Sequence, residues 1–191
     1  IADDAADPRL VSSEMLAQLE HDPLARAVLV TTSKRVLDSS VEWLRSLSSS
    51  APRREVIERS SEDGAVFLLA GDIEEAVAFS NEYAPEHLVI DVSSPEVVLA
   101  KVRSAGSVFL GRYSSVAFGD YCSGPNHILP TKGTAQARSS LSTYDFVKII
   151  PYQRVTSAGT AELSPLAEMM ATAEGLPGHA QAAALRREVM G

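Results

Sequence analysis

The chain has 191 residues, of which 45% are hydrophobic and 22% are charged, so it is long enough to bury a sizeable core. Its net charge of −8 argues against a nucleic-acid partner, because binding a phosphate backbone requires a basic face. No apolar run approaches the roughly 18 residues of a membrane-spanning helix, and no basic segment before an apolar core indicates a signal peptide, so we expect no membrane partner. The only cysteine, Cys122, allows no intrachain disulfide and favours a reducing compartment, either the cytoplasm or a plastid if the protein comes from a plant.

The first part of the chain predicts a helix, a strand and a second helix. The sequence opens at Ile1 without a methionine, and we interpret it as a fragment whose preceding strand has been cut short. Ser12 and Ser13 are natural caps for a helix over 12–21, which the residue before Pro23 ends. The β-branched run at 27–32 predicts a buried strand. Apolar residues at helical spacing then predict a helix, and they are Val36, Leu37, Val41, Leu44 and Leu47.

The alternation of strand and helix continues through the middle of the chain. We predict strands over 65–70, 88–92 and 107–110, with helices over 73–83 and 95–104 between them. Strands that alternate with helices of about ten residues are typical of crossover units and a parallel sheet. The predicted fold class is therefore α/β, a partial Rossmann-like parallel sheet flanked by helices.

The last third of the chain changes character. Residues 111–140 are rich in Gly, Ser, Pro and aromatic side chains, and an irregular segment of this length usually carries function. We therefore interpret 111–140 as an active-site loop of an α/β domain over 1–150. Residues 151–191 are predicted to form a small helical tail, with 151–159 as a linker and helices over 164–173 and 181–190.

Several polar residues occur in patterns that suit proton transfer or metal binding. Gln18 and His21 are three residues apart on a predicted helix, so both could reach one ion, although a solvated surface pair would look the same. Glu86 and His87 stand at a helix-to-strand turn and could exchange protons near neutral pH, or could simply cap the helix.

Three further residues in such patterns lie in the last part of the chain. Asp120 and His127 flank a glycine-rich stretch in which the backbone could approach a ligand, or which could be purely structural. His179 and the nearby Glu174 are by themselves more typical of a solvated turn. The chain contains no G-x-G-x-x-G, P-loop, C-x-x-C or H-E-x-x-H pattern.

Taken in order, these segments resemble histidinol dehydrogenase, the zinc enzyme that oxidises L-histidinol to L-histidine through histidinaldehyde with two molecules of NAD, the last step of histidine biosynthesis. The most specific matches are Gln18-Leu19-Glu20-His21, Ala84-Pro85-Glu86-His87-Leu88, Ala105-Gly106-Ser107-Val108-Phe109-Leu110-Gly111, and the run from Gly119 to Pro130. The resemblance covers the whole chain and corresponds to roughly the carboxy-terminal half of a family member.

The resemblance implies a role for each matched residue. Gln18, His21 and Asp120 match zinc ligands. His179 matches the ligand that completes the zinc site of the partner in a homodimer, which makes the tail over 151–191 a dimerisation segment. Glu86 and His87 match the acid–base pair. The implied binding site for histidinol combines the ligands and the catalytic histidine with two pocket residues, and comprises Gln18, His21, His87, Asp120, His127, Glu174 and His179. The resemblance places the NAD-binding residues in the missing amino-terminal part.

Two other interpretations remain open at the level of sequence. The chain could be a truncated, non-catalytic module of the same fold that binds zinc or a ligand, which the missing first half favours. It could also be a zinc hydrolase in which Glu86 activates water, since zinc with a glutamate and a histidine suits that chemistry. An assay with NAD separates a hydrolase from a dehydrogenase.

Overall fold

The computed structural model describes residues 1–188, and the chain divides into two compact units, Ile1–Phe146 and Val147–Gly191. The first unit contains parallel strands flanked by helices, and the second contains helices, which confirms the predicted α/β class with a helical tail. The two units are described separately.

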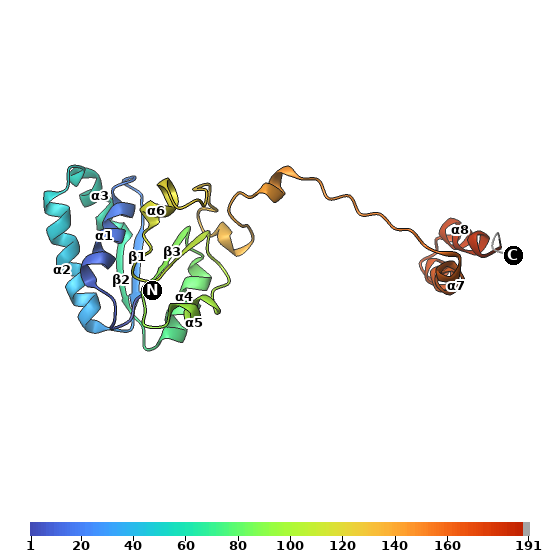
Figure 1. The fold of residues 1–191 in the computed structure, drawn as a ribbon, viewed down its shortest axis with the longest axis horizontal. Helices are drawn as coiled ribbons and strands as arrows, with labels where there is room; N and C mark the ends of the chain where they lie inside the picture. The colour runs from blue at the N-terminus through green and yellow to red at the C-terminus, as the bar shows by residue number, and fades with distance from the viewer. Residues whose placement is uncertain (189–191) are drawn as a thin grey trace. The chain divides into compact units, whose positions relative to one another are not determined.

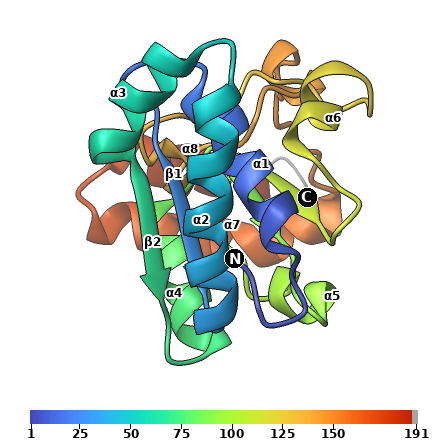
Figure 2. The same ribbon diagram turned by 90° about the vertical axis from the view of Figure 1, so that its left-hand side faces the viewer.

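The first part of the first unit is a two-stranded parallel sheet with three helices. Its elements are α1 (Pro8–Leu19), β1 (Ala27–Thr31), α2 (Lys34–Ser50), α3 (Arg54–Gly64) and β2 (Ala65–Leu69). β1 pairs with β2, so that Ala27 lies opposite Ala65 and Thr31 lies opposite Leu69. Helices α1 and α2 cover one face of this pair, as Figure 2 shows. Between them lies a core of apolar side chains in which Leu19 and Val36 are fully buried.

The second part of the first unit repeats this arrangement with shorter elements. They are α4 (Ile73–Tyr83), β3 (His87–Ile90), α5 (Pro95–Leu99), β4 (Ser107–Leu110) and α6 (Val116–Tyr121), followed by single turns at Thr134–Gln136 and Thr143–Phe146. β3 and β4 are parallel, with His87 opposite Ser107. Ile90 is fully buried in the apolar cluster around this pair.

The first two residues of the chain connect the two strand pairs. Ala2 forms parallel bridges to Thr31, the last residue of β1, and to Asp91, which follows β3. The Ala2 amide donates to the Val30 carbonyl at 3.0 Å, and the Ile1 amine donates to the Val89 carbonyl at 2.8 Å. Figure 1 shows the amino terminus lying between β1 and β3. Ile1 and Ala2 therefore link the two strand pairs, and all the strands of the unit are parallel.

Most of the predicted helices are present, but several of their bounds differ, and α3 was not predicted. The helix predicted over 12–21 is Pro8–Leu19, because Asp7 accepts a hydrogen bond from the Arg9 amide and Pro8 suits the first turn. Ser12 is not a cap: it is buried, and its hydroxyl donates to the carbonyls of Pro8 and Ser40. The helix predicted over 95–104 ends at Leu99.

The second unit is a hairpin of α7 (Ser157–Ala173) and α8 (Pro177–Glu188), and both helices begin earlier than predicted. α7 begins seven residues before the predicted Ser164 because Thr156 caps it, accepting from the Gly159 amide at 3.1 Å. Pro165 therefore lies inside the helix, and the Ser164 hydroxyl donates to the Ala183 carbonyl of α8. The end of the helix predicted over 181–190 lies outside the described residues. Among residues 1–188, no helix is both long and apolar enough to cross a membrane.

A matched pair of leucines tests where the core lies. Leu19 has no exposed surface, whereas the side chain of Leu24 is 88% exposed. Replacing Leu19 with Ala should lower the free energy of unfolding by about 2–5 kcal/mol, since it removes buried apolar area and creates a cavity. Leu24→Ala should change it by less than ~0.5 kcal/mol. Urea unfolding of both variants would show equal losses if α1 did not pack as described.

Candidate active site

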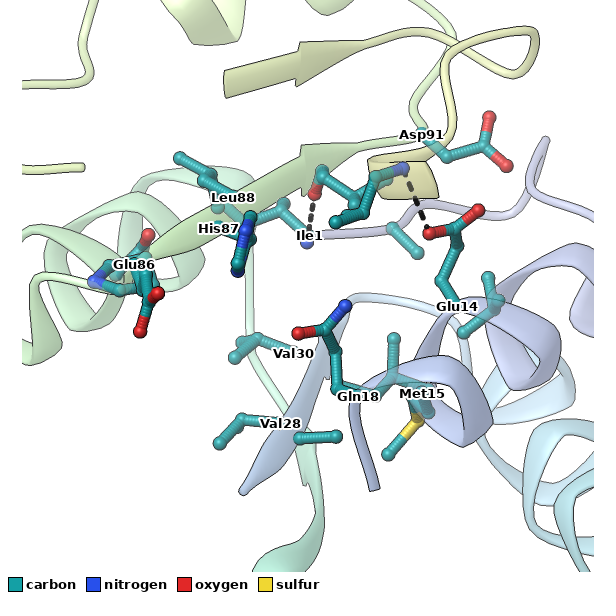
Figure 3. Close-up of a pocket in the computed structure, with 18 of the residues that line it drawn as sticks. Ile1, Glu14, Met15, Gln18, Val28, Val30, Glu86, His87, Leu88 and Asp91 are labelled. Atoms are coloured by element: carbon teal, nitrogen blue, oxygen red, sulfur yellow. Dashed lines mark hydrogen bonds between the residues drawn. The ribbon is translucent and has the colours of Figure 1, made fainter. Parts of the chain in front are cut away.

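A cavity of about 1330 Å³ lies between β1, β3 and α1 in the first unit. Its wall combines apolar side chains of the strands with polar side chains from α1 and from the turn before β3. Figure 3 shows Gln18 reaching into this space from α1 and His87 from β3, with Glu86 beside it. Three of the residues predicted to act in catalysis or zinc binding therefore line one cavity.

The turn between α4 and β3 sets the position of Glu86 and His87. Ala84 ends α4 in the left-handed conformation, with φ of 51°, and so reverses the chain at Pro85. The Gly106 amide then donates to the Pro85 carbonyl and the Ser107 amide to the Glu86 carbonyl, both at 2.9 Å. A Cβ on Gly106 would lie 2.5 Å from the Glu86 carbonyl oxygen, so only glycine allows this close approach.

The half-buried imidazole of His87 has one charged neighbour. Its Nε2 atom lies 3.8 Å from Oδ1 of Asp120, which stands near the end of α6, and its ring lies 6.0 Å from that of Phe109. Gly119 makes this possible, because a Cβ there would come within 2.6 Å of the Phe109 ring. The structure thus brings together a histidine and a carboxylate that are far apart in the sequence.

Glu14 is a residue of this region that the sequence analysis missed. It lines the cavity, and its carboxylate accepts a hydrogen bond of 3.2 Å from the Val116 amide at the start of α6. A carboxylate at the amino-terminal end of a helix pairs with an amide that has no partner within the helix, and it interacts favourably with the positive end of the helix dipole. Glu14 stands one turn before Gln18 on the same face of α1. The helical spacing of residues 14, 18 and 21 could therefore have indicated that Glu14 belongs to the same site.

The other predicted residues lie outside this cavity. His21 is exposed just after α1, and His127 is exposed in the segment that follows α6. Glu174 ends α7 and His179 lies in the first turn of α8, so both belong to the second unit. Within the described part of the chain, no three side chains of His, Cys, Asp or Glu lie close enough together to hold a metal ion. The zinc set of Gln18, His21, Asp120 and His179 therefore stays a prediction.

The predicted loop at 111–140 is partly structured. It contains α6 and the turn at Thr134–Gln136, and several hydrogen bonds attach it to neighbouring segments. The Gln136 side chain donates to the Glu82 carbonyl at 2.8 Å, and the Asn126 side chain donates to the carbonyl of Leu141. The segment therefore has defined contacts beside the turn that carries Glu86.

Comparison with known proteins gives one consistent result. The sequence profile of the family described as histidinol dehydrogenase matches residues 1–187. The histidinol dehydrogenase of Methanopyrus kandleri is 44% identical over 188 residues, which are 98% of this chain and 44% of that protein. That of Dechloromonas aromatica is 42% identical over 188 residues, 98% of this chain and 43% of that protein.

A solved structure agrees with the sequence matches. The crystal structure of histidinol dehydrogenase from Elizabethkingia anophelis superposes with a TM-score of 0.94 at 36% identity, covering 99% of this chain and 43% of that one. This chain belongs to the histidinol dehydrogenase family and spans less than half the length of the relatives that it matches.

Proposed function

We propose that this chain is the carboxy-terminal part of a zinc- and NAD-dependent histidinol dehydrogenase that oxidises L-histidinol to L-histidine through histidinaldehyde in a reducing compartment, the cytoplasm or a plastid. The observation that carries the proposal is the position of Glu86 and His87 on a cavity beside Asp120, in a chain whose whole length matches this family. The two side chains supply proton-transfer groups at adjacent positions, one for each oxidation.

His87 is the base for the first oxidation. Removing hydride from an alcohol carbon requires the hydroxyl proton to leave as well, and a half-buried imidazole that lines the cavity can accept it. The Asp120 carboxylate lies 3.8 Å from the Nε2 atom of His87 and can hold the ring in position as the proton moves. NAD supplies the chemistry of hydride acceptance in both oxidations.

Glu86 serves the second oxidation. An aldehyde must add water before it can lose another hydride, and the Glu86 carboxylate can take a proton from that water as it attacks. The product is the carboxylate of histidine. The backbone bonds from Gly106 and Ser107 hold Glu86 and His87 at fixed positions along β3, so that both groups act on one bound molecule.

The proposed zinc donors are Gln18, His21 and Asp120 of one protomer with His179 of the partner subunit. Nitrogen and oxygen donors of this kind suit zinc, which when bound would orient the imidazole and amine of histidinol. The Gln18 side chain already lines the cavity, and Asp120 adjoins it through His87. His127 and Glu174 are proposed to contact the substrate.

A homodimer follows from the proposed role of His179. In the second unit, α7 exposes several large apolar side chains that a second copy could cover, namely Leu163, Leu166, Met169 and Met170. A non-catalytic zinc- or ligand-binding module is the alternative, favoured by the share of the relatives that the chain spans.

A chimera tests the activity. We expect this chain, substituted for the matching region of the Methanopyrus kandleri enzyme, to reduce NAD with L-histidinol, whereas the chain alone should not. In the chimera, His87→Gln and Glu86→Gln should each lower kcat by about 10²- to 10⁴-fold, the usual contribution of a proton-transfer group.

The control is Glu82→Gln, which makes the same change on an exposed residue one turn earlier and should keep full activity. An inactive chimera that folds and binds zinc would support the non-catalytic alternative. Rapid NADH formation by the chain alone would contradict the proposed need for the remaining part.

Zinc retention tests the role of His179. His179→Ala should release zinc at least tenfold faster, since one of four donors is lost, and should not alter unfolding of the first unit, because the residue is exposed on α8. Gln181→Ala, also exposed on α8, is the control. Zinc per chain is measured by elemental analysis after dialysis. Equal retention in both variants would remove His179 from the proposed site.

A further inference from the structure

The peptide group that joins Glu86 to His87 is held by a chain of hydrogen bonds that begins outside the turn. The Glu86 carbonyl, which belongs to this peptide group, accepts from the Ser107 amide at 2.9 Å. That amide belongs to the peptide group between Gly106 and Ser107. The carbonyl of this second peptide group, on Gly106, accepts from the Ser140 hydroxyl. Ser140 is thus connected to the peptide group between Glu86 and His87 through one other peptide group.

A peptide group passes on an orientation because it is planar. Its carbonyl and its amide point in opposite directions, so a bond that fixes the Gly106 carbonyl also fixes the direction of the Ser107 amide. Hydrogen bonds in such a chain also polarise one another, so a donor at the Gly106 carbonyl strengthens the bond from Ser107 to Glu86. The Ser140 hydroxyl therefore acts on the stretch of backbone from which the two proton-transfer side chains project.

Ser140 reaches the Gly106 carbonyl because the chain packs tightly around this glycine. A Cβ on Gly106 would lie 3.0 Å from the Cδ atom of Pro130, which is buried. The Leu141 amide, next to Ser140, donates to the Ile128 carbonyl at 3.0 Å, so the two ends of this segment lie side by side. The backbone on both sides of the contact therefore sets the position of the Ser140 hydroxyl.

The same segment also holds the end of the helix that precedes the turn. Glu82 lies in the last turn of α4, where carbonyls have no partner within the helix. Its carbonyl accepts from the Gln136 side chain at 2.8 Å. The turn that carries Glu86 and His87 is therefore attached to this segment on the α4 side through Gln136 and on the β4 side through Ser140.

Ser140 is separated from the space in which the proposed reaction takes place. Among the described residues, those that line the cavity include Glu86 and His87 but not Ser140. Figure 3 shows Glu86 and His87 next to each other at this cavity. Removing the Ser140 hydroxyl would therefore take away no group that lines the cavity, and any effect on the reaction would have to pass through the backbone.

We propose that Ser140 is a positioning residue for Glu86 and His87. Its hydroxyl orients the peptide group between Gly106 and Ser107, and this group holds the peptide that joins the two proton-transfer residues. The inference rests on the proposed function, which assigns Glu86 and His87 to proton transfer. Since proton transfer requires donor and acceptor at hydrogen-bond distance, a small shift of this peptide group slows both oxidations.

Hydrogen exchange in the chain tests the bond from Ser140 to the backbone. Ser140→Ala removes the hydroxyl, so the Ser107 amide should exchange at least about tenfold faster than in Ser139→Ala, the same change at the exposed neighbouring residue. Ser140→Thr keeps a hydroxyl and should restore the slow exchange. The Gly111 amide, which donates to the Ile90 carbonyl at 2.8 Å, is the internal reference. Its exchange should stay the same in all three variants, because it lies at the other end of β3 and β4.

The chimera with the Methanopyrus kandleri enzyme tests the effect on proton transfer. Ser140→Ala should lower kcat by about 10- to 10²-fold relative to Ser139→Ala, the size of effect that a small misplacement of reacting groups produces. It should also raise the solvent deuterium isotope effect on kcat, because proton transfer becomes slower relative to the other steps. A loss of folded molecules would lower kcat and leave the isotope effect unchanged. Ser140→Thr should restore both values.

Two outcomes would overturn the proposal. Equal exchange of the Ser107 amide in the two alanine variants would mean that the Ser140 hydroxyl does not hold this peptide group. Faster exchange with an unchanged kcat and isotope effect would make Ser140 a structural residue only. An inactive parent chimera would overturn the proposed function, whereas exchange in the chain alone would still support or contradict the hydrogen-bonded chain.

Discussion

The bridge that Ile1 and Ala2 form between β1 and β3 is the interaction on which the rest of the first unit depends. Each strand pair has its own apolar cluster, and the hydrogen bonds to Val30, Val89 and Asp91 align the two pairs in one direction. Asp3 extends the connection, since its carboxylate accepts from the amide and hydroxyl of Ser93. Burial would raise the pKa of Asp3, but these hydrogen bonds outweigh it and lower that pKa.

The active-site geometry depends on two glycines, each of which allows a close approach. Gly106 lets β4 pair with the turn that carries Glu86, and Gly119 lets α6 pack on Phe109 so that Asp120 comes near His87. A side chain at either position would have to displace backbone or an aromatic ring. The positions of Glu86, His87 and Asp120 relative to one another are therefore fixed by packing between strands and helices, and not by the segment 111–140 alone.

Sequence patterns predicted the strands well, because β1, β2 and β4 are short apolar runs with turn residues on both sides. They missed α3, in which Ile57 is the only large buried side chain, so no apolar stripe marks it. That helix is held by tertiary contacts: the Ser60 hydroxyl donates to the Leu19 carbonyl, and Gly64 packs on Ala25. Likewise, the adjacency of Glu86 and His87 is visible in sequence, but their nearness to Asp120 arises only on folding.

The order in which the chain is synthesised determines when the bridge at Ile1 and Ala2 can be completed. Ile1 precedes its partner Val89 by 88 residues, so synthesis completes β1 and β2 long before β3 exists. During that interval the side of Ile1 and Ala2 that later pairs with β3 has no partner, and an unpaired strand edge is a template for association with other chains. Translation speed over residues 32–91, or a chaperone that covers this edge, would then set the yield of native protein.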